Sequence, residues 1–232
     1  MKSGIIYNGP SLLDGTAIIA IATFSNRNSK TGTMLQTYIL CRDQHPVEAN
    51  KTGNDSAICG ACNLRGIANP LSPKKLADDR ECYVNLAYGP SIVYKAFHNG
   101  VYPDATNAEA RSLLGENRVV RIGTYGDGAA IPSHIWDEVL LLSNGHTAYS
   151  HQKQWRPDIA MQSTDNITEA RWHWSRGSRT FRVIADLGDL DPHREVLCPA
   201  SKEAGRRTTC NDCKLCNGNA SKSPKSIAIV KH

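Results

Sequence analysis

The amino-acid sequence predicts an α/β protein, built as a partial parallel βα barrel of about six strands with an N-terminal β-hairpin and a cysteine-rich C-terminal loop. Two apolar runs separated by a polar stretch predict the hairpin. From Cys82 onward, strand-like runs alternate with amphipathic helical runs, which is typical of parallel strands joined by helical crossovers. The strands are too few for a complete eight-stranded barrel. An open doubly wound sheet is the alternative arrangement.

The composition is that of an ordinary globular chain. The 232 residues are 40% hydrophobic and 21% charged, which is enough for one compact domain. We expect this domain to have three parts: the hairpin and linker in 1–58, the barrel core in 59–197, and a metal loop with the final strand in 198–232. The formal net charge of +5 permits a nucleic-acid partner without requiring one.

The beginning of the chain lacks the features of a targeting or membrane segment. The stretch "MKSGIIYNGP" has no long apolar region of the kind found in a signal peptide. The run "TAIIAIATF" is too short to cross a bilayer. We therefore expect a cytoplasmic protein without a membrane partner. In a reducing compartment, clustered cysteines indicate metal or redox chemistry more often than disulfides.

The N-terminal part begins with two expected strands at 17–23 and 34–40, and the turn formers of "FSNRNSKTG" lie between them. A polar, irregular stretch over 42–80 follows and carries the motif "CGAC". Long loops of this kind usually have a function or are disordered, and the two cysteines favour function. A short strand is expected at 83–87.

The remaining elements alternate in type. Helices are expected at 91–100, 107–116, 132–145 and 166–177. Three of these helices have an expected N-cap, at Ser91, Ser133 and Asn166. Further strands are expected at 119–124, 146–150, 158–163, 180–185 and 227–231.

Seven of the eight cysteines fall into two groups. The first cysteine group is Cys59, Cys62 and Cys82. The second cysteine group is Cys198, Cys210, Cys213 and Cys216. Two residues between thiolates let a turn aim both sulfurs at one ion or cluster. The eighth cysteine, Cys41, ends an expected strand and is interpreted as a core residue.

The two groups predict different kinds of metal site. Four thiolates fit either a tetrahedral zinc ion or a [4Fe–4S] cluster, so the second cysteine group predicts one of these. For the first cysteine group, zinc would need His98 or another residue as a further ligand. A [4Fe–4S] cluster on three thiolates could instead keep one iron open for a substrate or cofactor. Free thiols or adventitious disulfides are the alternative for both groups.

Polar residues follow the expected strands, and functional groups gather at the carboxyl ends of strands in parallel α/β folds. Asp127 lies in the glycine turn "GTYGDGAA", His151 follows the next strand, and Asp165 follows the one after. We interpret all three as candidate catalytic residues, with His151 and Asp165 as an acid/base pair across neighbouring strands. Asp127 would hold an ammonium or hydroxyl group of a ligand, or it would only cap the tight turn.

The cysteines ahead of the first βα unit, the Gly-acid turn and the βα repeats together resemble the radical S-adenosylmethionine (SAM) fold. The resemblance implies that the first cysteine group binds a [4Fe–4S] cluster whose open iron chelates SAM. It also implies that Gly126 and Asp127 approach the methionine amine, and Tyr125 and Ser150 complete the predicted cofactor site. The second cysteine group resembles an auxiliary cluster site. The wider layout, "CGAC…CYVNLAYGP…GTYGD…CPASKEAG…CNDCKLC", is similar to uncharacterised phage-type proteins.

Two functions follow from these observations. The first is an iron–sulfur enzyme similar to radical-SAM proteins, with a small molecule or a nucleic acid as its substrate. The alternative is a zinc-stabilised protein that binds or processes nucleic acid through the basic segment 202–207 and the Trp/Arg-rich helix at 166–177. In a third interpretation, both cysteine groups are structural zinc sites and the strand ends bind a small ligand.

Overall fold

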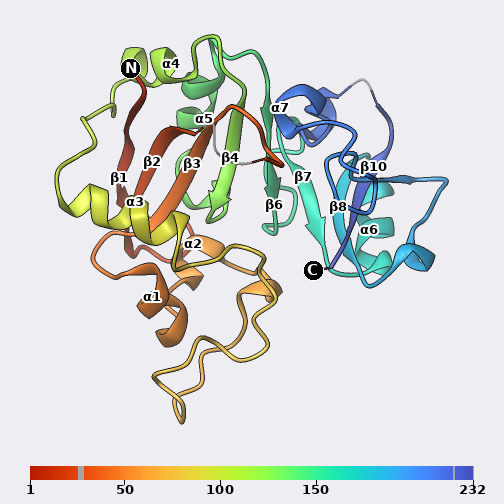
Figure 1. Cartoon of the computed structure of the whole chain (residues 1–232), viewed down its shortest axis with the longest axis horizontal. Helices are drawn as coiled ribbons and strands as arrows, with labels where there is room; N and C mark the ends of the chain where they lie inside the picture. Colours follow the sequence, from red (N-terminus) through yellow and green to blue (C-terminus); the bar gives the residue numbers. More distant parts are fainter. Residues whose placement is uncertain (26–28, 222, 232) are drawn as a thin grey trace.

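The computed structural model describes residues 1–25, 29–221 and 223–231, and its strands form two sheets (Figure 1). The first sheet has the order β1 (Ser3–Pro10), β2 (Ala17–Ser25), β3 (Met34–Cys41), β4 (Val120–Tyr125) and β5 (His146–Thr147). The second has the order β6 (Tyr149–Ser150), β7 (Met161–Thr164), β8 (Thr180–Ile184), β10 (Ser226–Val230) and β9 (Glu195–Leu197).

The first sheet is mixed and the second is parallel throughout. The strands β1, β2 and β3 pair antiparallel, so the predicted hairpin is confirmed, although 26–28 in the middle of its turn lie outside the described residues. The strands β4 and β5 then continue in parallel with β3. Every pairing in the second sheet is parallel.

The two sheets meet at the short segment 146–150. Its first residues pair with β4 and its last residues pair with β7. Between them, the Ala148 carbonyl still accepts from Met161 N at 3.0 Å, but the Ala148 N–H donates to the Cys216 carbonyl at 2.7 Å. The expected α/β architecture with parallel strands is therefore confirmed. In the described ranges no strand pairing joins β9 to β1, so the partial barrel itself stays a prediction.

Helices cover the sheets because their apolar sides pack on the strands. The helices are α1 (Pro46–Thr52), α2 (Ser56–Cys59), α3 (Gly89–His98), α4 (Ala108–Gly115), α5 (Ser133–Leu140), α6 (Ile167–Trp174) and α7 (Cys210–Cys213). The first three contact β3, α4 contacts β1 and α5, and α6 contacts β7 and β8. Buried side chains of the first sheet form one large core around Trp136, and a smaller core lies around Met161 in the second sheet. No helix in the described part of the chain is long and apolar enough to cross a membrane.

Several expected elements differ from the structure. Residues 83–87 form no strand, because Asn85 makes a turn in which its carbonyl accepts from Tyr88 N at 3.3 Å. Ser91 is not an N-cap, since α3 begins two residues earlier and the Ser91 hydroxyl donates to the Leu86 carbonyl. Ser133 is the first residue of α5 and not its cap. Asn166 is confirmed, because its side chain accepts from Glu169 N at 2.9 Å.

Candidate functional site

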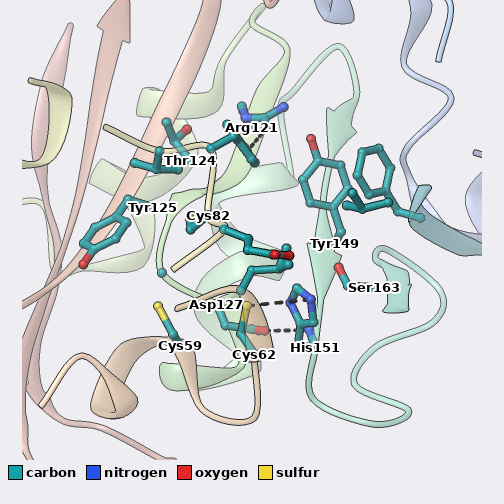
Figure 2. A pocket seen from close by; sticks show the side chains of 18 of the residues that line it. Cys59, Cys62, Cys82, Arg121, Thr124, Tyr125, Asp127, Tyr149, His151 and Ser163 are labelled. Atoms are coloured by element: carbon teal, nitrogen blue, oxygen red, sulfur yellow. Dashed lines mark hydrogen bonds between the residues drawn. The ribbon is translucent and has the colours of Figure 1, made fainter. Parts of the chain in front are cut away.

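A cavity of about 460 Å³ opens between the two sheets (Figure 2). Strands β3, β4, β6, β7, β8 and β10 all contribute lining residues, and so does the loop that carries the first cysteine group. Cys59, Cys62 and Cys82 all line this cavity, together with Asp127 and His151. The structure thus brings the first cysteine group and two of the predicted strand-end residues into one place.

A buried ion pair positions the loop that carries Cys59 and Cys62. Arg65 Nη2 lies 2.8 Å from Asp55 Oδ1, and Asn50 donates to the other oxygen of Asp55 at 2.7 Å. Cys59 ends α2, and Cys62 N then donates to the Cys59 carbonyl at 3.2 Å. Local hydrogen bonds therefore fold the CxxC motif into a compact turn, as its spacing predicts.

Cys82 comes later in the sequence, but the backbone places it next to this turn. Its N–H donates to the Leu64 carbonyl at 2.8 Å. The Arg80 guanidinium holds the following backbone, donating to the Cys82 carbonyl at 2.9 Å and to the Val84 carbonyl. These bonds set Cys82 beside the CxxC turn in the cavity wall.

The three thiols of the first cysteine group act on one another electrostatically. Burial raises the pKa of Cys59 well above its usual range, and Asp55, Cys62 and Cys82 raise it further. Burial also raises the pKa of Cys82, with Cys62 adding to the effect. The thiols of Cys59 and Cys82 are therefore harder to ionise than that of a free cysteine. None of the eight cysteines forms a disulfide.

The first cysteine group places three thiols in the lining of one cavity, and thiolates are the usual protein ligands of iron–sulfur clusters. A ready-made ligand set is absent, since the described residues contain no group of three His, Cys, Asp or Glu side chains arranged to hold an ion. Metal binding here would therefore need thiol deprotonation and side-chain rotation. His98, once a candidate zinc ligand, is not among the described lining residues, and its Nε2 lies 3.0 Å from the Arg42 carbonyl oxygen.

Asp127 forms hydrogen bonds with several of the segments that surround the cavity. Its carboxylate accepts from Ser150 Oγ at 2.7 Å, from His151 N at 2.8 Å and from Ala129 N at 3.0 Å. Its own N–H donates to the Ile58 carbonyl at 2.6 Å. The interpretation of Asp127 as a cap is therefore confirmed by its bond to Ala129, and Ser150 is its hydrogen-bond partner. Roles for both residues in binding a cofactor stay predictions.

The two residues before Asp127 are a glycine that packing requires and a buried tyrosine. Gly126 has φ of +82°, and a Cβ there would lie 2.8 Å from Ile39 Cβ, so packing alone requires the glycine. Tyr125 is buried in the lining, and its hydroxyl has no hydrogen-bond partner among the described residues. An unsatisfied buried hydroxyl is costly, and a role for Tyr125 or Gly126 in binding a cofactor stays a prediction.

His151 and Asp165 do lie next to each other. The His151 Nε2 atom is 3.7 Å from Asp165 Oδ1 and 3.7 Å from Cys62 Sγ. Asn63, in the cysteine loop, donates to the other oxygen of Asp165 at 2.8 Å. Burial opposes a charged imidazole, but Asp165 and Cys62 raise the pKa of His151 to about 10. The predicted proximity is confirmed, and the 3.7 Å separation is that of an ion pair rather than a hydrogen bond.

The opposite end of the cavity contains aromatic and cationic residues that the sequence did not single out. Arg121 of β4 donates from Nη2 to the Tyr83 hydroxyl at 2.8 Å. Its guanidinium lies 5.2 Å from the centre of the Tyr149 ring, which stacks on Phe181. Figure 2 shows Arg121 and Tyr149 toward one end of the site and Cys59, Cys62 and His151 toward the other. The signal in the sequence is a single cation inside the apolar run "VVRIGTY".

The second cysteine group forms a separate cluster beside α7. Burial raises the pKa of Cys210, Cys213 and Cys216, and Cys198 acts on all three. Backbone bonds hold the cluster, since Cys210 N donates to the Lys30 carbonyl at 3.0 Å. The described lining of the cavity contains none of these four thiols. The four residues are neighbours as predicted, and whether they bind metal stays a prediction.

The Trp/Arg-rich helix α6 packs mainly as an ordinary amphipathic helix. The indole N–H of Trp174 contacts Thr180 and Ser226 in the second sheet. The exposed Trp172 ring is covered by Arg176, whose guanidinium lies 3.8 Å from the ring centre. Trp174 is therefore engaged within the fold, whereas Trp172 keeps an exposed ring beside Arg176, and the nucleic-acid alternative stays a prediction for this helix and for the segment 202–207.

Comparisons of the chain with protein-family models, with curated proteins and with solved structures find no match in any of the three. The resemblance to radical-SAM and phage-type proteins therefore stays a prediction. The residues of the cavity are the basis on which a function can be proposed.

Proposed function

We propose that the cavity is the active site of an iron–sulfur enzyme. Cys59, Cys62 and Cys82 would hold a [4Fe–4S] cluster with one open iron position, and SAM would be its cofactor. The observation that carries the proposal is that three free thiols line one cavity of about 460 Å³. Three protein ligands leave a coordination position free, and the cavity provides space beside it.

The cluster would supply one-electron chemistry, while the chain would bind and shield the reactants. Phe181, Val183 and Ile229 give part of the cavity an apolar wall that excludes water. The bonds of Asp127 to Ser150 and to the His151 backbone fix the rim next to the thiols.

His151 and Asp165 would serve the bound substrate as a proton-carrying pair. Asp165 orients the imidazole, and Asn63 orients Asp165 from the cysteine loop itself. A proton held at His151 Nε2 lies beside Cys62, so its donor faces the space where a substrate would meet the cluster.

The metal content of protein purified without oxygen tests the proposal. We expect about four iron and four sulfide per occupied site, with a brown colour and an electron paramagnetic resonance signal after reduction. A variant with serine at all three positions of the first cysteine group should lose this iron. The Cys41→Ala variant is the matched control, because Cys41 is a buried thiol outside both groups, and it should keep the iron. Stoichiometric zinc in colourless wild-type protein would contradict the proposal.

A zinc site is the second candidate, and the position of His151 favours it. The imidazole Nε2, 3.7 Å from Cys62 Sγ, could complete a Cys₃His set. In that case the His151→Ala variant should lose zinc from the first cysteine group. Binding of nucleic acid through 202–207 would then weaken steeply with added salt.

The second cysteine group is proposed to hold a second cluster or a zinc ion. Serine at its four positions should remove that metal and leave the metal of the first cysteine group in place. Loss of both metals together, with the fold intact by circular dichroism, would count against two independent sites.

A further inference from the structure

Arg121 is a buried cation in the wall of the cavity. It is the second residue of β4, and it is 6% exposed. Its guanidinium donates to the Tyr83 hydroxyl and lies against the Tyr149 ring. Because arginine stays protonated in proteins, the cavity contains a fixed positive charge.

Comparison with the other deeply buried arginines shows what Arg121 lacks. Arg111 and Arg182 are 7% and 4% exposed, and each has a glutamate oxygen at 2.6 Å. Arg179 donates instead to the backbone carbonyls of Lys225 and Gly218. Among the ion pairs of the described residues, none includes Arg121.

A buried charge without a carboxylate partner is costly. The thiol of Cys210 acts on Arg121 from the second cysteine group, and the cavity provides space for a ligand beside the guanidinium. Neutral phenols satisfy some of the guanidinium donors but do not balance its charge. An oxyanion in the cavity would supply both the charge and the paired acceptors that a guanidinium fits.

The surroundings of Arg121 also restrict the rest of such a ligand. Tyr149 and Phe181 stack with their ring centres 4.3 Å apart, and Val183 and Ile229 line the same cavity. A molecule with its oxyanion at Arg121 would therefore lay an apolar or aromatic body along this wall. Figure 2 shows Cys59 and Cys62 toward the other end of the site, with Cys82 between them and Arg121.

We propose that Arg121 is the anion-binding residue of the cavity and that the substrate carries a carboxylate or phosphate on a largely apolar body. The oxyanion lies at Arg121 and the reacting part points toward the first cysteine group. This inference rests on the proposed function in taking the cavity as the active site, and it adds the chemical class of the substrate.

Calorimetric titration with three probes of similar shape tests the inference on the wild-type chain. Benzoate and phenyl phosphate carry the two oxyanions, and benzyl alcohol is the neutral control. A charge-assisted bidentate contact corresponds to about a tenfold or greater difference in affinity. We expect at least one of the two anions to bind about ten times more tightly than benzyl alcohol, and the stronger one identifies the oxyanion. Equal binding of all three probes would overturn the inference without any variant being made.

Variants then place the contact. Arg121→Gln should reduce the affinity for the preferred anion to that of benzyl alcohol, and Arg121→Lys should keep part of it because the charge remains. Arg42→Gln, which removes an exposed arginine, should change nothing. Anion affinity that survives Arg121→Gln in folded protein would overturn the inference.

Arg121 has one competing role, because it also lowers the pKa of Cys210 and Cys216 in the second cysteine group. If it serves only that group, Arg121→Gln will release metal from the second cysteine group and leave anion binding intact, which overturns the inference. The serine variant of the first cysteine group separates the two proposals. Anion binding that persists in this variant supports the inference even where no iron is found, and iron without anion binding supports only the proposed function.

Discussion

His151 and Asp165 stand at the ends of neighbouring parallel strands, with Nε2 and Oδ1 3.7 Å apart beside Cys62. Each residue changes the pKa of the other. Asp165 and Cys62 raise the pKa of His151 to about 10 although burial opposes the charge, and His151 lowers the pKa of Asp165. The pair therefore carries opposite charges at neutral pH in the metal-free chain.

The Asp165→Asn variant should lower the pKa of His151 toward the usual value of about 6.5, because the largest favourable partner of the imidazolium is removed. Nuclear magnetic resonance titration of the metal-free protein measures this pKa. The same pair contributes stability that is complete below the unfolded pKa of about 6.5 and is lost as the pH rises to about 10. The free energy of unfolding should thus differ more between wild type and variant at pH 6 than at pH 10. An unchanged pKa of His151 would show that the two groups do not interact.

The Asp127→Ala variant should reduce the free energy of unfolding by about 2–4 kcal/mol, because four donors lose a buried acceptor at once. Urea denaturation measures the change. Asp14→Ala is the matched control, since Asp14 accepts a similar local bond from Thr16 N at an exposed position. Equal effects of the two substitutions would contradict the structural role of Asp127.

The Gly126→Ala variant should be destabilised by about 2 kcal/mol or more, because strain at positive φ adds to a clash with Ile39. Gly15→Ala separates the two causes. Gly15 has nearly the same φ, +83°, but a Cβ added there would have no atom within 4 Å. We expect a loss of about 1 kcal/mol for Gly15→Ala. Thermal and urea denaturation measure the free energy of unfolding of both variants. A clash with Ile39 is shown only if Gly126→Ala loses clearly more of this free energy than Gly15→Ala.

The Glu195→Gln variant should lose about 3–5 kcal/mol of unfolding free energy, because Arg182 would stay buried without its counter-charge. This pair joins β8 to the beginning of β9 in the second sheet. Asp43→Asn breaks the exposed pair with Arg42 and should change the stability very little. A loss as small as that of the control would mean that the interior around Arg182 admits water.

The fold was predictable where apolar runs were long and bounded by turn formers. Strands β2, β3, β4, β8 and β10 lie within a few residues of their expected positions. The strand β9 escaped prediction because Glu195–Leu197 is only three residues long and pairs on one side with β10. The stretch "YVNLAYG" has the composition of a strand. Its Val84 carbonyl accepts from the Arg80 guanidinium instead of from a neighbouring strand, and the Asn85 side chain accepts from Ala87 N in a turn.

The site was predictable in part, for a related reason. Cysteine spacing is a local signal, so both cysteine groups could be found from the sequence. The nearness of His151 to Asp165 followed from the parallel order of strands. Arg121 could not be recognised, because its importance depends on Tyr83 and Tyr149, which come from distant segments.

A backbone hydrogen bond at Ala148 connects the second cysteine group to the junction of the two sheets. The sheets are joined through 146–150, and at their junction the Ala148 N–H is bonded to the carbonyl of Cys216 rather than to a strand. The loop of the second cysteine group thus contributes a backbone hydrogen bond to the junction of the two sheets whose strands line the cavity. A change of backbone conformation at residues 210–216 would therefore remove a bond that holds this junction.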